Sequence, residues 1–199
     1  ASTMPSARGL EPGDTAADFE LRNAQSFVMD GTHSDPSKSS FKPVHMSLEQ
    51  TIGEAGGVIM FTCNHCPYVV ASEERIESIA SLCRENGLGF VGINSNDPVV
   101  YSSDNWDNMI IRAGEMSYPY LHDSDQTIAR AYGAERTPEF FLINAHGIIV
   151  YRGRLDDSPK DPTKATTSEL VDAINSTLSK SPIEINRTDP IGCSVKWKE

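Results

Sequence analysis

A segment near residue 60 joins an apolar run to a helical pattern through two cysteines, and it constrains the fold more than any other feature of the chain. Residues 58–61 have the length and composition of a buried strand. Cys63 and Cys66 follow, Pro67 suits the first position of a helix, and residues 68–86 carry apolar side chains at helical spacing. The sequence therefore predicts a strand, a turn that holds both thiols, and a helix.

The remaining segments extend this unit into an alternation of strands and helices. Strand-like runs occupy residues 19–21, 89–93, 118–121, 139–143 and 148–152, and helical patterns occupy residues 104–116, 123–131 and 167–178. A tight turn joins the last two strands, which indicates an antiparallel hairpin. This order predicts an α/β sandwich whose sheet has a parallel portion and an antiparallel edge.

The length of 199 residues predicts one domain with appendages. We expect a flexible N-terminal arm over residues 1–16, a domain over residues 17–180 with a polar surface insertion around residues 23–45, and a C-terminal tail over residues 181–199. Apolar and polar residues alternate in the tail, which indicates an extended segment that docks on the domain. The apolar positions are Ile191, Cys193, Val195 and Trp197.

Charge and hydropathy exclude two classes of partner. The chain has 17 Lys and Arg against 28 Asp and Glu, and the resulting net charge of −11 would repel phosphate backbones, so we expect no nucleic-acid partner. No run approaches the roughly 18 apolar residues of a membrane span. Residues 1–3 precede Met4, which fits either a processed chain of an organelle or bacterial periplasm, or a cytoplasmic chain that starts at Met4.

The two cysteines of the predicted turn have the setting of a redox pair. A cysteine at the start of a helix faces unpaired N–H groups and the positive end of the helix dipole, which favour the thiolate, so we predict Cys63 as the nucleophile. Cys66, three residues on, can then attack a mixed disulfide on Cys63 and release the product. His65 lies between them, and an imidazolium there would stabilise a thiolate further; the alternative is a solvated loop histidine.

Other roles for the cysteines have less support in the sequence than a redox pair. A zinc site needs four ligands, usually in two paired motifs, whereas Cys83 and Cys193 are both solitary, so we predict no metal. Cys83 lies on the apolar stripe of its helix and is expected to be a small buried hydrophobe. Cys193 is expected either to be buried with the tail or to act as a third redox thiol.

Polar residues also follow the strand over residues 89–93. Asn94, Asn96 and Asp97 lie at the carboxyl end of that strand, the same sheet edge as the predicted redox pair. Turn formation alone explains them.

Several motifs together resemble a thioredoxin-like branch, in particular the thiol-disulfide proteins related to peroxiredoxins of the AhpC/TSA type and to cytochrome-maturation thioredoxins. The resemblance covers roughly residues 10–199. It rests on the segments Cys63-Asn-His-Cys-Pro-Tyr68, Ile93-Asn-Ser-Asn-Asp-Pro98, Pro119-Tyr-Leu121, Ala131-Tyr-Gly-Ala134, Thr137-Pro138, Tyr151-Arg-Gly-Arg-Leu-Asp-Asp157 and Ile191-Gly-Cys-Ser-Val-Lys-Trp-Lys198.

This resemblance implies a thioredoxin-like three-layer sandwich: a mixed sheet with flanking helices, an N-terminal extension and an extended C-terminal tail. It also implies a cis peptide bond between Thr137 and Pro138, whose loop faces the redox pair. The backbone of Thr137 would bind an extended substrate strand beside the disulfide. Pro138 would deny access to metals, and Asn64 would join Thr137 and Pro138 in the substrate-binding group.

The chain departs from thioredoxins at two positions. Thioredoxins carry a buried acid six residues before the first cysteine and a tryptophan immediately before it, where this chain has Gly57 and Thr62. The sequence therefore shows no carboxylate to move the proton of Cys66, which leaves His65 or water.

These observations favour a thiol-disulfide oxidoreductase that needs no cofactor and exchanges disulfides with a protein substrate and a further redox partner through Cys63 and Cys66. One alternative is a peroxiredoxin-like thiol peroxidase, although residues 58–66 lack the proline of the peroxidatic motif. The other is a redox-inactive binding or assembly subunit that forms a protein complex through residues 23–45 and the tail.

Overall fold

The computed structural model describes residues 9–28 and 43–199, which form a mixed seven-stranded sheet in the order β2-β1-β5-β4-β3-β7-β8. Its strands are β1 (Glu20–Asn23), β2 (His45–Ser47), β3 (Gly56–Thr62), β4 (Leu88–Asn94), β5 (Tyr120–His122), β7 (Glu139–Asn144) and β8 (Ile149–Gly153); β6 (Arg136–Thr137) and β9 (Cys193–Ser194) form a separate pair. The helices are α1 (Leu48–Thr51), α2 (Pro67–Glu85), α3 (Trp106–Ala113), α4 (Thr127–Tyr132) and α5 (Glu169–Leu178), with 3-10 turns at Ala24–Phe27, Ser102–Asp104 and Pro162–Lys164.

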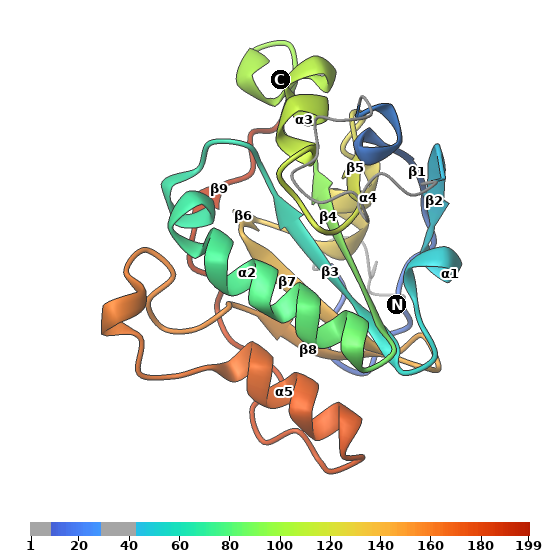
Figure 1. The fold of residues 1–199 in the computed structure, drawn as a ribbon, viewed down its shortest axis with the longest axis vertical. Helices are drawn as coiled ribbons and strands as arrows, with labels where there is room; N and C mark the ends of the chain where they lie inside the picture. The colour runs from blue at the N-terminus through green and yellow to red at the C-terminus, as the bar shows by residue number, and fades with distance from the viewer. Residues whose placement is uncertain (1–8, 29–42) are drawn as a thin grey trace, which may run out of the picture.

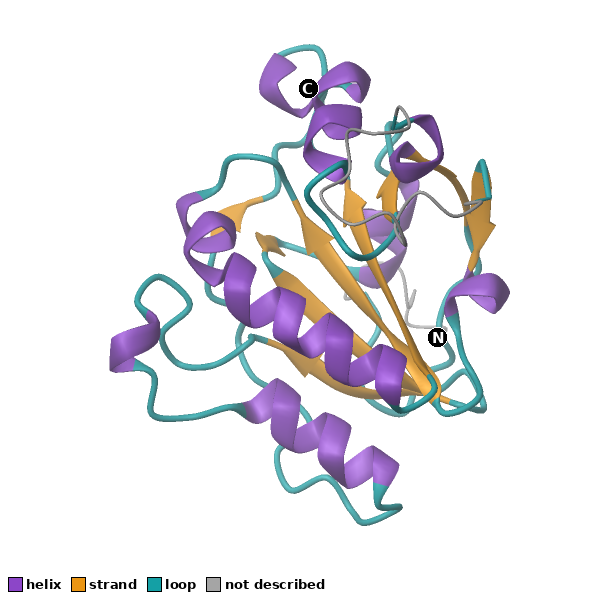
Figure 2. Cartoon of the chain, in the orientation of Figure 1, coloured by secondary structure: helices purple, strands orange, loops and turns teal. Residues whose placement is uncertain are grey.

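The central strands combine both orientations, as the sequence predicts. Strands β3, β4 and β5 are parallel, whereas β7 is antiparallel to both β3 and β8, and β1 is antiparallel to β5 and β2. The α/β fold and its thioredoxin-like class are confirmed. Figure 1 shows α2 and α5 in front of the sheet, and Figure 2 shows how loops join the strands to the helices that flank them.

Alternation along the strands divides the apolar side chains between two cores. In β3, Val58 and Met60 face the core that includes buried residues of α2, α3 and α5, while Ile59 and Phe61 face the core that includes α4. The same division holds along β4 and β7. Because successive side chains of a strand point to opposite faces, a fully buried strand such as β3 needs apolar residues at every position.

The N-terminal segment differs from its prediction as a flexible arm. Residues 1–8 lie outside the described residues, but residues 9–16 pack on the domain. The Leu10 N–H donates to the Tyr132 carbonyl at 3.0 Å, the Gly13 N–H donates to the Ile149 carbonyl at 2.8 Å, and Ala16 is buried. These hydrogen bonds hold the segment in place, which polar composition alone did not reveal.

The predicted insertion around residues 23–45 is described only at its two ends, since residues 29–42 lie outside the described part of the chain. Its first end continues β1 into the 3-10 turn, and its second end forms β2, which pairs with β1. Ser47 then caps α1: its hydroxyl accepts from the Gln50 N–H, and the Gln50 side chain accepts from the Ser47 N–H. The sequence analysis predicted neither strand β2 nor helix α1.

The tail runs along the domain in three places. The Thr188 N–H donates to the Arg152 carbonyl in β8 at 3.0 Å, β9 pairs with β6, and the Lys196 N–H donates to the Asn96 side chain at 2.9 Å. Its strand pairing is shorter than the alternating pattern predicts. Strand β6 is followed by Pro138, which has no N–H to continue a ladder. No helix within residues 9–28 and 43–199 is long and apolar enough to cross a membrane.

Candidate redox site

The predicted thiols lie where β3 ends and α2 begins. Thr62 is the last residue of β3, Cys66 is the N-cap of α2, and Pro67 is its first residue. The positive end of the helix dipole therefore acts most directly on Cys66, because Cys63 lies three residues further from the helix. Cys63 lies before the helix and is buried, as is Cys66.

Cys193 of the tail joins this pair and completes a cluster of three thiols. Its Sγ atom lies 2.6 Å from that of Cys66, and all three thiols are free. The Cys63 Sγ lies 3.5 Å from the Thr137 hydroxyl, and the Cys66 Sγ lies 3.4 Å from the Thr137 carbonyl oxygen. These groups line a small cavity of about 220 Å³, which is also lined by His65, Tyr101 and Asp104.

The electrostatics of the cluster favour the thiolate form of Cys66. A hydrogen bond from Cys63 lowers the pKa of Cys66 to about 4, against the opposing effect of burial, and a hydrogen bond from Cys193 lowers it further. The same bond to Cys66, together with burial, raises the pKa of Cys63, and burial raises the pKa of Cys193 to about 11. The sequence predicts Cys63 as the nucleophile, with its thiolate stabilised by the helix; the surroundings of the pair instead favour the thiolate form of Cys66.

The two residues between the cysteines differ in their surroundings. His65 is exposed and lines the cavity, and no hydrogen bond joins its ring to another described residue. Asn64 is buried: its amide donates to the Ser103 carbonyl at 2.8 Å and accepts from the Tyr120 hydroxyl at 2.6 Å. The side chain of Asn64 is therefore held by the fold, and its role in substrate binding stays a prediction.

A buried carboxylate that sequence reasoning missed lies beside the pair. Asp104, at the end of the 3-10 turn before α3, accepts hydrogen bonds from the Asn64 N–H at 2.8 Å and from the side chains of Asn94 at 2.9 Å and Asn96 at 3.1 Å. Its charge raises the pKa of Cys63. Asn94 and Asn96, which the sequence interpretation explains by turn formation, therefore form part of a polar network under the thiols.

The Thr137–Pro138 peptide bond is cis, and hydrogen bonds to the Glu139 side chain fix the loop before it. The buried Glu139 side chain accepts from the N–H groups of Glu135 at 2.9 Å and Arg136 at 3.1 Å, and pairs with Arg152 at 3.1 Å. Burial raises the pKa of Glu139, whereas these partners lower it. The pairing fixes the backbone that faces Cys63 and Cys66.

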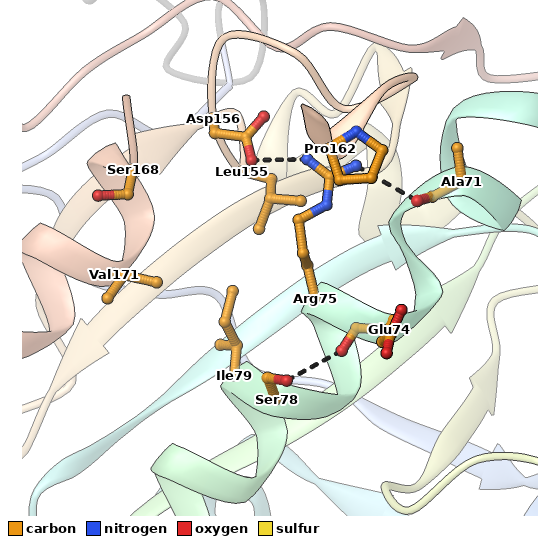
Figure 3. Close-up of a pocket in the computed structure, with 10 residues that line it drawn as sticks. All are labelled: Ala71, Glu74, Arg75, Ser78, Ile79, Leu155, Asp156, Pro162, Ser168 and Val171. Carbon is orange, nitrogen blue, oxygen red and sulfur yellow. Dashed lines mark hydrogen bonds and ion pairs between the residues drawn. The ribbon is translucent and has the colours of Figure 1, made fainter. Parts of the chain in front are cut away.

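A larger cavity of about 460 Å³ lies between α2 and the loop after β8, away from the thiols (Figure 3). Arg75, which lines this cavity, pairs with Asp156 at 2.7 Å and donates to the carbonyls of Ala71, Ser158 and Pro159. Arg75 therefore anchors the loop after β8 to α2. Within the described part of the chain, no group of three His, Cys, Asp or Glu side chains could hold a metal ion.

The fold and the cysteine site together define a thioredoxin-like, thiol-based redox protein. The model of the Redoxin family matches residues 12–173, and the chain belongs to that family. A comparison with curated proteins finds no match.

Solved structures support the same assignment. An uncharacterised conserved protein from Geobacillus kaustophilus is 34% identical, with a TM-score of 0.78 over 94% of this chain and 92% of that one. A hypothetical protein from Sinorhizobium meliloti 1021 is 28% identical, with a TM-score of 0.78 over 96% of each chain. Peroxidoxin BcpB from Mycobacterium tuberculosis is 19% identical, with a TM-score of 0.52 over 85% of this chain and 95% of that one, which shows a shared fold alone.

Proposed function

We propose that the protein is a thiol-disulfide oxidoreductase whose reacting pair is Cys63 and Cys66. The observation that carries the proposal is the placement of the two sulfurs at the start of α2, where both face Thr137. The Cys63 Sγ lies 3.5 Å from the Thr137 hydroxyl, and the Cys66 Sγ lies 3.4 Å from the Thr137 carbonyl oxygen. A hydrogen bond with Cys63 lowers the pKa of Cys66 to about 4, which favours a Cys66 thiolate in the reduced pair.

The exchange then proceeds in two steps. Cys63 attacks a substrate disulfide while its proton passes to the departing sulfur, so that a mixed disulfide on Cys63 and one free thiol form. The thiolate of Cys66 next attacks the sulfur of Cys63, which forms the Cys63–Cys66 disulfide and releases the second substrate sulfur as a thiolate. Both electrons that reduce the substrate come from the two cysteines, and no cofactor takes part.

An exposed apolar loop beside the cavity supports a protein substrate. Tyr101 lines the cavity and is 42% exposed, and the two residues before it, Val99 and Val100, are 82% and 71% exposed. Val70, in the first turns of α2, is 49% exposed. Large apolar side chains grouped near a reactive site are typical of protein-binding surfaces.

The test is equilibration of the reduced protein in glutathione buffers, followed by alkylation and mass spectrometry. Because a stabilised thiolate favours the reduced form, we expect a reduction potential less negative than the roughly −270 mV of thioredoxin. A pair that stays reduced in every buffer would support the redox-inactive subunit instead. Oxidation by hydrogen peroxide that outpaces oxidation by glutathione disulfide, with sulfenic acid on Cys63, would support the peroxidase.

A further inference from the structure

The tail occupies the position at which an extended substrate strand would bind. Strand β9 pairs antiparallel with β6, so that Cys193 lies opposite Thr137 and Ser194 opposite Arg136. The Val195 N–H also donates to the Glu135 carbonyl at 3.0 Å. Figure 1 shows β9 and β6 beside the start of α2, and this register carries the Cys193 thiol to the Cys66 thiol.

Specific contacts on both sides of Cys193 hold this register. The backbone of Lys196 donates to the Asn96 side chain at 2.9 Å and accepts from the Asp97 N–H at 2.8 Å and the Gln126 amide at 2.8 Å. Trp197 packs under the Arg130 guanidinium, 4.5 Å from its ring centroid. The tail is thus anchored close to the thiols through Asn96, which also donates a hydrogen bond to Asp104.

Gly192 allows the tail to approach the loop this closely. A Cβ atom added there would lie 2.1 Å from the Thr137 carbonyl oxygen and 2.6 Å from its carbon. Both are backbone atoms of the rigid loop before Pro138, so any larger residue would push the tail away from β6. Gly192 therefore offers a way to undock the tail without a change to any thiol.

We propose that Cys193 is a third exchanging thiol, carried by an internal strand that imitates a substrate, and that the oxidised protein rests as a Cys66–Cys193 disulfide. This inference rests on the proposed function of Cys63 and Cys66. In the added step, Cys193 attacks the Cys66 sulfur of the Cys63–Cys66 disulfide; the Cys66–Cys193 bond forms, the Cys63–Cys66 bond breaks, and the proton of Cys193 passes to Cys63. The step moves a disulfide within the chain and needs no further oxidant.

The geometry favours this transfer over a merely structural role for Cys193. Its sulfur lies 2.6 Å from that of Cys66, already near the roughly 2.05 Å of a disulfide bond. The transfer returns Cys63 to the thiol form. An external protein strand has to displace the tail in order to pair with Thr137. The tail therefore competes with a substrate protein for the site.

Peptide mapping tests the inference directly. Trypsin cleavage leaves Cys63 and Cys66 on one peptide, residues 39–75, and Cys193 on another, residues 188–196. After oxidation with glutathione disulfide and acid quenching, we expect most oxidised chains to carry a link between the two peptides. Cys63→Ser should still form this link, and Cys66→Ser should not. Oxidised wild-type protein with the Cys63–Cys66 disulfide alone would overturn the inference.

Two further variants separate docking of the tail from its thiol. Gly192→Ala should reduce the linked fraction at least tenfold and leave the Cys63–Cys66 disulfide in its place, whereas the control Lys198→Ala should match the wild type. Cys193→Ser should lower the equilibrium constant for oxidation by glutathione about tenfold, which corresponds to about 30 mV. An unchanged linked fraction in Gly192→Ala, or an unchanged constant in Cys193→Ser, would count against the proposed strand.

The outcomes also distinguish the two proposals. If Cys63 and Cys66 oxidise normally but never link to Cys193, the result supports the proposed oxidoreductase and contradicts the proposed exchange role of Cys193. If the pair stays reduced in all glutathione buffers, in wild type and Cys193→Ser alike, the proposed function itself fails.

Discussion

Helix α2 carries a cysteine near each end, and the two side chains have opposite chemistry. Cys66, at the N-cap, shares hydrogen bonds with the Cys63 and Cys193 thiols, which lower its pKa to about 4. Cys83, in the last turn, is 0% exposed, packs in the core that α2 shares with β3 and β4, and its pKa rises to about 12 because of burial. The residue type is the same at both ends. Hydrogen bonds at Cys66 favour a thiolate, whereas apolar packing at Cys83 favours the neutral thiol.

This contrast shows which features of a cysteine report function. Both thiols are buried, so burial alone does not separate them. What differs is the set of hydrogen-bonding groups around the sulfur, one of which, Cys193, comes from a segment 127 positions away. The same substitution at the two ends should therefore have opposite consequences for activity and for stability.

The largest expected effect is on activity at the N-terminal end. Cys66→Ser should lower the rate of disulfide exchange about a thousandfold or more, because loss of a reacting group costs an enzyme this much or more. Cys83→Ser should leave the rate within about twofold of the wild type. Stopped-flow mixing with glutathione disulfide measures both, and a comparable loss in Cys83→Ser would remove the distinction between the two ends.

The reverse effect is expected on stability. Cys83→Ser places a hydroxyl among apolar side chains such as Ile79 and Leu88, and an unsatisfied buried polar group costs about 1–3 kcal/mol. Below about pH 4, where the Cys66 thiolate no longer adds stability, Cys66→Ser should cost less, since the hydroxyl can keep the partners that the sulfur has. Urea unfolding of both reduced variants tests this order; equal losses would show that the two sites are packed alike.

The fold was more predictable from the sequence than the site. Strand β3 and helix α2 follow from local signals, an apolar run and a proline before a helical pattern, so their positions were predicted within a few residues. Asp104 was missed because it lies about 40 residues beyond the cysteines and only the packing of its turn brings it under them. Cys193, which adds to the effect of Cys63 in lowering the pKa of Cys66, lies 127 positions away, and no local pattern specifies that contact.

A smaller change should follow from the donor that Cys63 provides. The pKa of Cys66 is lowered from 9.0 to about 4, so the thiolate adds stability that is fully present above pH 9 and is lost as the pH falls through about 4. Cys63→Ser keeps a hydroxyl donor, whereas Cys63→Ala removes it and should raise the pKa of Cys66 by about one pH unit or more. Thiolate absorbance near 240 nm against pH measures the difference; identical curves would mean that Cys63 is not the donor.

The smallest effect should come from the link between the thiols and the tail. Asn96 donates to Asp104 at 3.1 Å and accepts from the Lys196 N–H at 2.9 Å, so Asn96→Ala removes a side chain that holds both the network and the tail. A single hydrogen bond contributes about 1 kcal/mol, which corresponds to a roughly fivefold rise in the population with an undocked tail. Hydrogen exchange at the Lys196 and Val195 amides should accelerate by that factor, while amides at the Cys83 end of α2 should be unaffected. Equal acceleration at both places would indicate general unfolding instead. Exchange confined to the tail would show that Asn96 holds the tail on the domain without contributing to the stability of α2 as a whole.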